Sequence, residues 1–212
     1  PNLKISPYLQ TSFFIISLSL IPSFVVCCTS YIRTTIMLSY LKSALGSTQA
    51  LSNQLLMGIT LFVTMFIMWP VGERTWNTAI NPYLEGKIEQ AEFVQKMPLP
   101  VREWMLANAR DEDLKLFCRL GKIPAKTYDE IPFRVILPSY IMSEIKTGFF
   151  IGFLIYIPFL VVDMVVASVL MSMGMFMISP TTISLPFKLV LFCSLDGWHM
   201  VKIGRASCRE RV

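Results

Sequence analysis

The sequence is dominated by one apolar stretch at residues 143–198, SEIKTGFFIGFLIYIPFLVVDMVVASVLMSMGMFMISPTTISLPFKLVLFCSLDGW. Its inner part, residues 149–187, holds 39 residues and a single formal charge, that of Asp163. A helix that is apolar on every side has no face to present to water. At 1.5 Å per residue one straight helix of this length would reach about 58 Å, nearly twice a roughly 30 Å hydrocarbon core. The run is therefore expected to fold back as a helical hairpin.

The expected turn of this hairpin lies at Ser179, Pro180, Thr181 and Thr182. Proline lacks a backbone N–H donor, and serine and threonine side chains hydrogen-bond to nearby backbone, so this combination favours a turn. The arm before the turn is expected to be a helix over residues 139–178, which Pro138 would begin.

Two further runs without charge precede this hairpin, at residues 5–32 and 43–72, and each is long enough to span a bilayer. Arg33 and Lys42 lie between them and are interpreted as cations that reach out to the membrane edge. The mean hydropathy of +0.57 and the apolar fraction of 54% indicate a membrane protein. We therefore predict an all-α, membrane-associated fold built from long apolar helical hairpins.

The character of the chain changes at residues 73–134, which contain ten acidic and ten basic side chains and must face water or another protein. Hydrophobic periodicity predicts a helix over residues 100–120. The acidic residues 111–113, followed by Lys115 and Arg119, give i,i+4 pairs that are typical of a solvated helix. The predicted domains are the N-terminal apolar helices (1–72), this polar helical insert (73–134) and the C-terminal apolar hairpin (135–202).

Composition argues against several classes of function. The five cysteines include no CxxC spacing and His199 is the only histidine, so no metal site is expected. The sequence contains neither a Walker loop nor a GxGxxG motif, so we expect no nucleotide or other cofactor. The net charge of +5 arises from scattered bases that flank apolar segments, which is typical of membrane edges and not of a nucleic-acid surface.

Four ionisable residues interrupt the apolar C-terminal region, namely Glu144, Lys146, Asp163 and Lys188. Because a charge at the centre of a spanning helix costs roughly 2.5–3.5 kcal/mol, it normally faces a partner or a cavity. Glu144 and Lys146 are two residues apart, so on a helix they cannot pair with each other. We interpret all four as members of ion pairs between segments or subunits. Two alternatives stay open: contact of Glu144 and Lys146 with water, and a relay through Asp163 and Lys188 in an ion-coupled secondary transporter.

Residues 143–146 match S-x-x-K and residues 146–148 match K-T-G, two fragments of the β-lactamase signature. In those enzymes the two motifs lie on different elements, whereas here they share Lys146. A membrane hydrolase with Ser143 as its nucleophile is therefore retained only as a third class of function, and we do not expect the chain to be an enzyme.

Methionine alternates with other residues at Met171, Met173, Met175 and Met177. On a helix these side chains divide between two faces, and a spacing of two aligns them only where the backbone is extended. Gly174 lies within the run, where a helix is easily lost. Because methionine is flexible and polarisable, these side chains suit a deformable seal. Ordinary apolar filling of a core is the alternative interpretation.

The stretch at 143–198 closely resembles the C-terminal half of the FliP family, the flagellar export-gate proteins, whose virulence counterparts are the R-type inner-membrane components of type III secretion. The resemblance extends to residues 43–46 (SALG), 66–71 (FIMWPV), 102–106 (REWML) and 113–117 (DLKLF). These motifs occur in the same order, and the resemblance covers nearly everything from about Ser12 to Val201.

The resemblance implies a non-enzymatic, pore-forming structural subunit of the flagellar type III protein export gate. Such a subunit passes unfolded flagellar proteins across the bacterial inner membrane at the flagellar basal body, and is needed for flagellum assembly. The implied partners are other copies of the chain, Q and R export-gate subunits, membrane lipid and the exported proteins, with no nucleic acid. The equivalent subunit of a virulence type III secretion system is the alternative.

The methionine-rich loop of the family is thought to act as a gasket in the pore. It maps onto Met175, Phe176 and Met177, and we add Met173 to the predicted gasket. The family often has three consecutive methionines at this place, so Phe176 departs from the pattern and predicts a stiffer seal.

The last ten residues, 203–212 (IGRASCRERV), depart from the mostly apolar tail of the family. They resemble the translation of a sequencing-library adapter, and we interpret them as an assembly artefact with no part in function.

Overall fold

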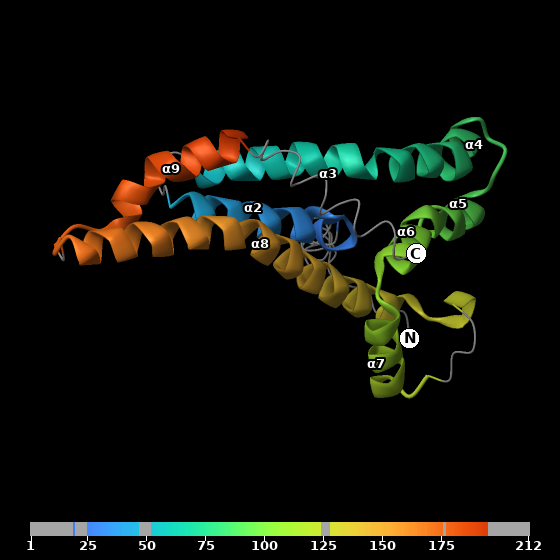
Figure 1. Cartoon of the computed structure of the whole chain (residues 1–212). Helices are drawn as coiled ribbons and strands as arrows, with labels where there is room; N and C mark the ends of the chain where they lie inside the picture. Colours follow the sequence, from blue (N-terminus) through green and yellow to red (C-terminus); the bar gives the residue numbers. More distant parts are fainter. Residues whose placement is uncertain (1–18, 20–24, 47–51, 124–127, 176, 195–212) are drawn as a thin grey trace, which may run out of the picture. The chain divides into compact units, whose positions relative to one another are not determined.

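The computed structural model describes residues 19, 25–46, 52–123, 128–175 and 177–194. Within these residues every regular element is a helix and no strand occurs, so the all-α prediction is confirmed. In chain order (Figure 1) the elements are α2 (Tyr31–Leu45), α3 (Asn53–Thr75), the π-helix η1 (Trp76–Ile80), α4 (Asn81–Leu84), α5 (Gln90–Lys96), α6 (Leu99–Asn108), α7 (Asp111–Leu120), the 3-10 helix η2 (Tyr128–Glu130), α8 (Phe133–Ser172) and α9 (Pro180–Ser194).

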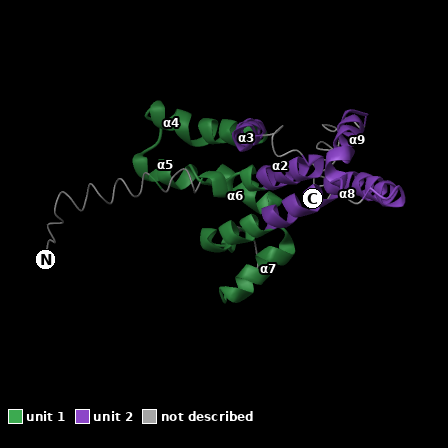
Figure 2. Ribbon diagram, turned by 90° about the vertical axis from the view of Figure 1, so that its left-hand side faces the viewer, with its two compact units in different colours: residues 1–32, 67–142 green, residues 33–66, 143–212 purple. Residues whose placement is uncertain are grey.

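The chain divides into two compact units, each made of separate pieces of sequence (Figure 2). Unit 1 combines residues 1–32 with 67–142, and unit 2 combines 33–66 with 143–212. As a result α2, α3 and α8 each contribute residues to both units. The polar insert at 73–134 falls inside unit 1, and the domain boundaries drawn from composition stay a prediction.

The core of unit 2 forms where α2 packs on the second part of α8. Apolar side chains of α3 and α9 complete it from the sides. Burial of each such side chain stabilises the fold by about 1.5–3 kcal/mol, so this core holds the arms of the hairpin in place. Its buried members are Met37, Leu38, Leu41, Ala44, Leu45, Ile151, Ile155 and Phe159, with Leu56, Ile59, Tyr156, Leu191 and Phe192 packed against them.

Unit 1 has a separate core between α6, α7 and the first turns of α8. Met105, Leu114 and Ile136 are buried in it, and the indole N–H of Trp104 donates to the hydroxyl of Tyr140 over 3.3 Å. The apolar side chains of α6 and α7, within the polar insert, therefore pack into a small core of unit 1.

The single helix predicted over residues 100–120 is wrong, because the chain breaks between α6 and α7. Ala109 and Arg110 are extended, with ψ of 140° and 138°. The break lets a new helix begin with three acidic residues in its first turn, where negative charge is favoured by the helix dipole. One of them, Asp113, is buried and not solvated as predicted.

Helix α8 begins at Phe133 and ends at Ser172, so the predicted span of 139–178 is displaced at both ends. Pro138 lies inside the helix, where it removes one hydrogen bond and costs about 3 kcal/mol in a helix interior. Burial of Val135, Ile136 and Tyr140 on the same turns outweighs that cost.

Two helical segments in the described residues are long and apolar enough to cross a membrane. They are Asn53–Leu84, which contains α3, η1 and α4, and Phe133–Ser172, which is α8. Both present large exposed apolar side chains, among them Phe62, Phe66 and Phe153. Apolar surface of this extent needs cover from lipid or from another protein.

Candidate functional site

The tip of the hairpin begins where glycine ends α8. Gly174 has a φ of +76°, a backbone conformation that glycine adopts without steric cost. The N–H of Gly174 donates to the carbonyl of Met171 and that of Met175 to the carbonyl of Leu170, each over 3.0 Å. These two bonds form a Schellman motif, which satisfies the last carbonyls of the helix and turns the chain away from its axis.

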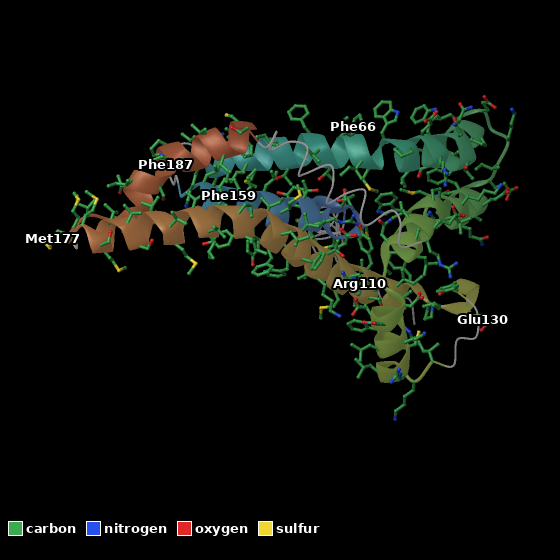
Figure 3. The ribbon with its side chains drawn as sticks, viewed as in Figure 1. Phe66, Arg110, Glu130, Phe159, Met177 and Phe187 are labelled. Carbon is green, nitrogen blue, oxygen red and sulfur yellow. The ribbon has the colours of Figure 1, made fainter. Side chains whose placement is uncertain are left out.

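The alternating methionines lie at this tip and are all exposed, namely Met171, Met173, Met175 and Met177. Met177 is 99% exposed and lies at the free end of the α8–α9 hairpin (Figure 3). Residues 173–175 lie beyond the last residue of α8. Side chains spaced by two can align only where the backbone is not helical, so this part of the run meets that condition. Phe176 lies outside the described residues. The tip therefore presents thioethers on a non-helical segment, and their role as a gasket stays a prediction.

The turn lies earlier than predicted, because Pro180, Thr181 and Thr182 form the first turn of α9. Proline is favoured at the first helical position, where its fixed φ suits a helix and its missing N–H is not needed. Ser179 precedes the helix, and its hydroxyl lies 2.7 Å from that of Thr181. The chain thus reverses over residues 173–179, and the predicted turn residues begin the second arm.

Asp163 of α8 and Lys188 of α9 form an ion pair across the two arms. The Lys188 ammonium donates to Asp163 Oδ2 over 2.6 Å, and the Ser184 hydroxyl donates to Asp163 Oδ1 over 2.5 Å. The Lys188 side chain is only 3% exposed and that of Asp163 28%. Both carboxylate oxygens therefore accept a hydrogen bond, and the two opposite charges balance inside apolar surroundings.

The end of α2 approaches the same ammonium group. Gly46 follows the last residue of α2 with a φ of +66°, and a Cβ built there would lie 3.7 Å from Lys188 Nζ. The C-terminus of a helix carries partial negative charge, so a cation beside it is stabilised. Lys188 thus lies between the carboxylate of Asp163 and the C-terminal end of α2, and ties together three helices of unit 2.

Glu144 forms a second ion pair, with Arg33 of α2. Arg33 Nε donates to Glu144 Oε2 over 2.7 Å, and a second guanidinium nitrogen contacts Glu144 Oε1. Such two-point contact is the strong arrangement for an arginine–carboxylate pair, and the Glu144 side chain is only 1% exposed. The interpretation of Arg33 as a cation at the membrane edge is therefore wrong. Lys146 is exposed, two residues further along α8.

Two glycines let α2 lie close against α8 beside this pair. A Cβ on Gly148 would lie 3.2 Å from the carbonyl oxygen of Arg33, and one on Gly152 would lie 2.6 Å from Tyr40 Cδ2. Glu144, Gly148 and Gly152 recur every four residues and so share one face of α8. This spacing is the signal in the sequence that would have identified the face against which α2 packs.

The hydrolase interpretation finds no support in this arrangement. Ser143 is fully buried inside unit 2, so a substrate has no access to its hydroxyl. Among the described residues no group of three or more histidine, cysteine or acidic side chains lies close enough together to hold a metal ion.

Comparison with known proteins identifies the family of this chain. The sequence model of the FliP family matches residues 14–204. The chain belongs to the FliP family. It is 47% identical to the flagellar biosynthetic protein FliP of Pectobacterium carotovorum over 193 residues. This aligned region covers 91% of this chain and 75% of that protein. It is 46% identical to the proteins of the same name from Buchnera aphidicola and Caulobacter vibrioides, covering 91% and 87% of this chain and 51% and 70% of theirs.

Proposed function

We propose that this FliP-family chain is a pore-forming structural subunit of the flagellar type III protein export gate. In this role it passes unfolded flagellar proteins across the bacterial inner membrane at the flagellar basal body, and flagellum assembly requires it. Its partners are further copies of itself, Q and R gate subunits, membrane lipid and the exported chains. The observation that carries the proposal is the family match over residues 14–204.

The exposed apolar surface of the two long helices supports an assembled subunit. α3 and α8 present rows of aromatic and aliphatic side chains to their surroundings, and surfaces of this kind mark interaction with proteins or membrane. Glu144, Asp163 and Lys188 are paired within the chain, so the surface left for partners is apolar over most of both helices.

The names of the relatives favour the flagellar system over a virulence system, since each of those compared is a flagellar biosynthetic protein. The pairing of Asp163 with Lys188 favours a structural role over a proton relay. Both oxygens of the Asp163 carboxylate and the Lys188 ammonium are held by contacts between the two arms of the hairpin, as in a pair that joins helices.

A chimera tests the proposal. Residues 14–202 replace the matching segment of FliP in a motile bacterium that lacks its own copy, and the host protein restored from the same vector is the positive control. We expect recovery of swimming, of secretion of flagellar subunits, and of co-purification with the Q and R subunits from the inner-membrane fraction. A chimera that accumulates in that fraction yet binds neither subunit would contradict the proposal.

A further inference from the structure

Among the described methionines, four gather within seven residues at the hairpin tip. Met171 lies in the last turn of α8, Met173, Met175 and Met177 lie on the loop beyond it, and all four are exposed. By contrast Met105 is fully buried in the core of unit 1. Most of the other exposed methionines, such as Met164, lie on the membrane-length helices, where lipid or protein cover is needed, and Met97 lies singly on the turn after α5. The hairpin tip is thus the place in the described residues where exposed thioethers cluster.

We propose that these four methionines form a peroxide-sensitive modification site, and that their oxidation to methionine sulfoxide opens the seal at the hairpin tip. The effect on the seal rests on the function proposed above, whereas the modification itself rests only on the exposure of the four side chains. The co-substrate is hydrogen peroxide or another small hydroperoxide.

The reaction transfers one oxygen atom. A lone pair on the thioether sulfur attacks one peroxide oxygen, the O–O bond breaks and an S–O bond forms. Sulfur is oxidised by two electrons, and the other peroxide oxygen leaves after proton transfer, as water from hydrogen peroxide or as an alcohol from an organic hydroperoxide. Because the step needs only access of peroxide to sulfur, exposed thioethers react before buried ones.

The product has properties opposite to those a seal needs. A thioether side chain is flexible and apolar, whereas the sulfoxide is polar and disrupts methionine-rich contacts. Four sulfoxides at one hairpin tip attract water to a surface that closes by excluding it. Methionine sulfoxide reductases reverse the change, so the site can return to its sealed state.

The modification is tested first on the chain in native membranes. Membranes are treated with hydrogen peroxide, and oxidation is measured by mass spectrometry in the peptides that contain the tip, Met164 and Met105. We expect the tip peptide to be oxidised several-fold faster than both others. Equal oxidation of the tip and Met164 peptides would overturn the assignment of a special site, whether or not the chain assembles with partners.

The consequence is tested on the complex with Q and R subunits, reconstituted in dye-loaded vesicles. Peroxide is expected to raise the leak of small ions several-fold, dithiothreitol alone to leave it raised, and dithiothreitol with both sulfoxide reductases to restore the seal. The comparison with dithiothreitol separates methionine from cysteine oxidation.

All four tip methionines are replaced by leucine, which has similar volume and no sulfur, and the leak of this variant is measured before and after peroxide. Whatever its leak before treatment, we expect peroxide to leave that leak unchanged. Met164→Leu is the matched control, in which peroxide should raise the leak by the same factor as in the unchanged chain. If peroxide raises the leak of the fourfold leucine variant by that factor as well, the tip is not the sensitive element. That result would overturn this inference while the gate function stands, because the variant has assembled with the Q and R subunits.

Discussion

Asp163→Ala probes the ion pair that joins the two arms of the hairpin. Removal of the carboxylate leaves the Lys188 ammonium, whose side chain is 3% exposed, without its anionic partner. Ser184 keeps one acceptor, the carbonyl of Thr181 at 3.2 Å, so the unpaired ammonium is the main consequence. We expect the variant to fail in assembly and not in the working of an assembled gate.

The size of the effect follows from the burial of the cation. Removal of one member of a buried ion pair costs about 3–5 kcal/mol, because the remaining charge is left uncompensated. Each 1.4 kcal/mol is a factor of ten in an equilibrium constant. The ratio of folded to unfolded hairpin therefore falls by roughly two to three and a half powers of ten. A domain with about 5–15 kcal/mol of total stability loses about a fifth or more of it.

Two control variants sharpen the test. The Lys87–Glu85 pair spans 2.5 Å but both side chains are exposed, so Glu85→Ala should cost no more than about 1 kcal/mol. The double change Asp163→Leu with Lys188→Met removes both charges at once and is expected to recover much of the loss, since apolar residues of similar volume replace buried ion pairs with little cost.

The assay measures two quantities in the same cells, the amount of chain that co-purifies with the Q and R subunits and the secretion of flagellar proteins. For Asp163→Ala both should fall together. A variant that assembles at normal levels but does not secrete would refute the reasoning and would revive the relay interpretation of Asp163 and Lys188.

Three further changes test separate parts of the structure. Gly152→Ala places a methyl group 2.6 Å from Tyr40 Cδ2, and overpacking of this kind costs about 1–3 kcal/mol. The resistance of the chain to protease in detergent should therefore fall. Adding Tyr40→Ala to this variant should restore it. Gly174→Ala puts a side chain on a residue with a φ of +76°, which costs about 1–2 kcal/mol, so the leak of an assembled gate should rise while chain levels hold. The hydrogen bond from Tyr128 to Asp111 raises the pKa of the phenol, so this contact persists at neutral pH and is lost as the pH rises through the raised value. In Tyr128→Phe, a tyrosinate absorbance titration should lose a component that titrates above the ordinary pKa of tyrosine.

The fold class could be predicted because it depends on composition over long windows. A run of 39 residues with one charge permits few structures, and the helical hairpin follows from its length. The exact ends of the helices could not be predicted, since burial decided them. Pro138 resembles a helix start in sequence, but the apolar residues before it are buried and extend α8 back to Phe133.

The partners of charged residues were predictable only where the sequence offered few choices. Asp163 and Lys188 are the only charges in their region of the hairpin, so their proximity could be anticipated from sequence. Glu144 had no comparable constraint, because its partner, Arg33, lies 111 residues away. Only the recurrence of small residues at 148 and 152 indicated that another helix lies close to that face.

The two ion pairs and the four exposed tip methionines occupy different parts of unit 2, in accord with their chemistry. An ion pair is directional and loses its stabilisation when its partner moves, so Arg33–Glu144 and Asp163–Lys188 lie where α2, α8 and α9 pack against one another. A thioether makes weak contacts in many directions and tolerates rearrangement, so methionine belongs where the surface has to change shape. The last helical residue, Ser172, lies nine positions after Asp163 on α8, and beyond it the chain turns through Gly174. We therefore expect a tip on such a base to deform around a passing chain without breaking either ion pair.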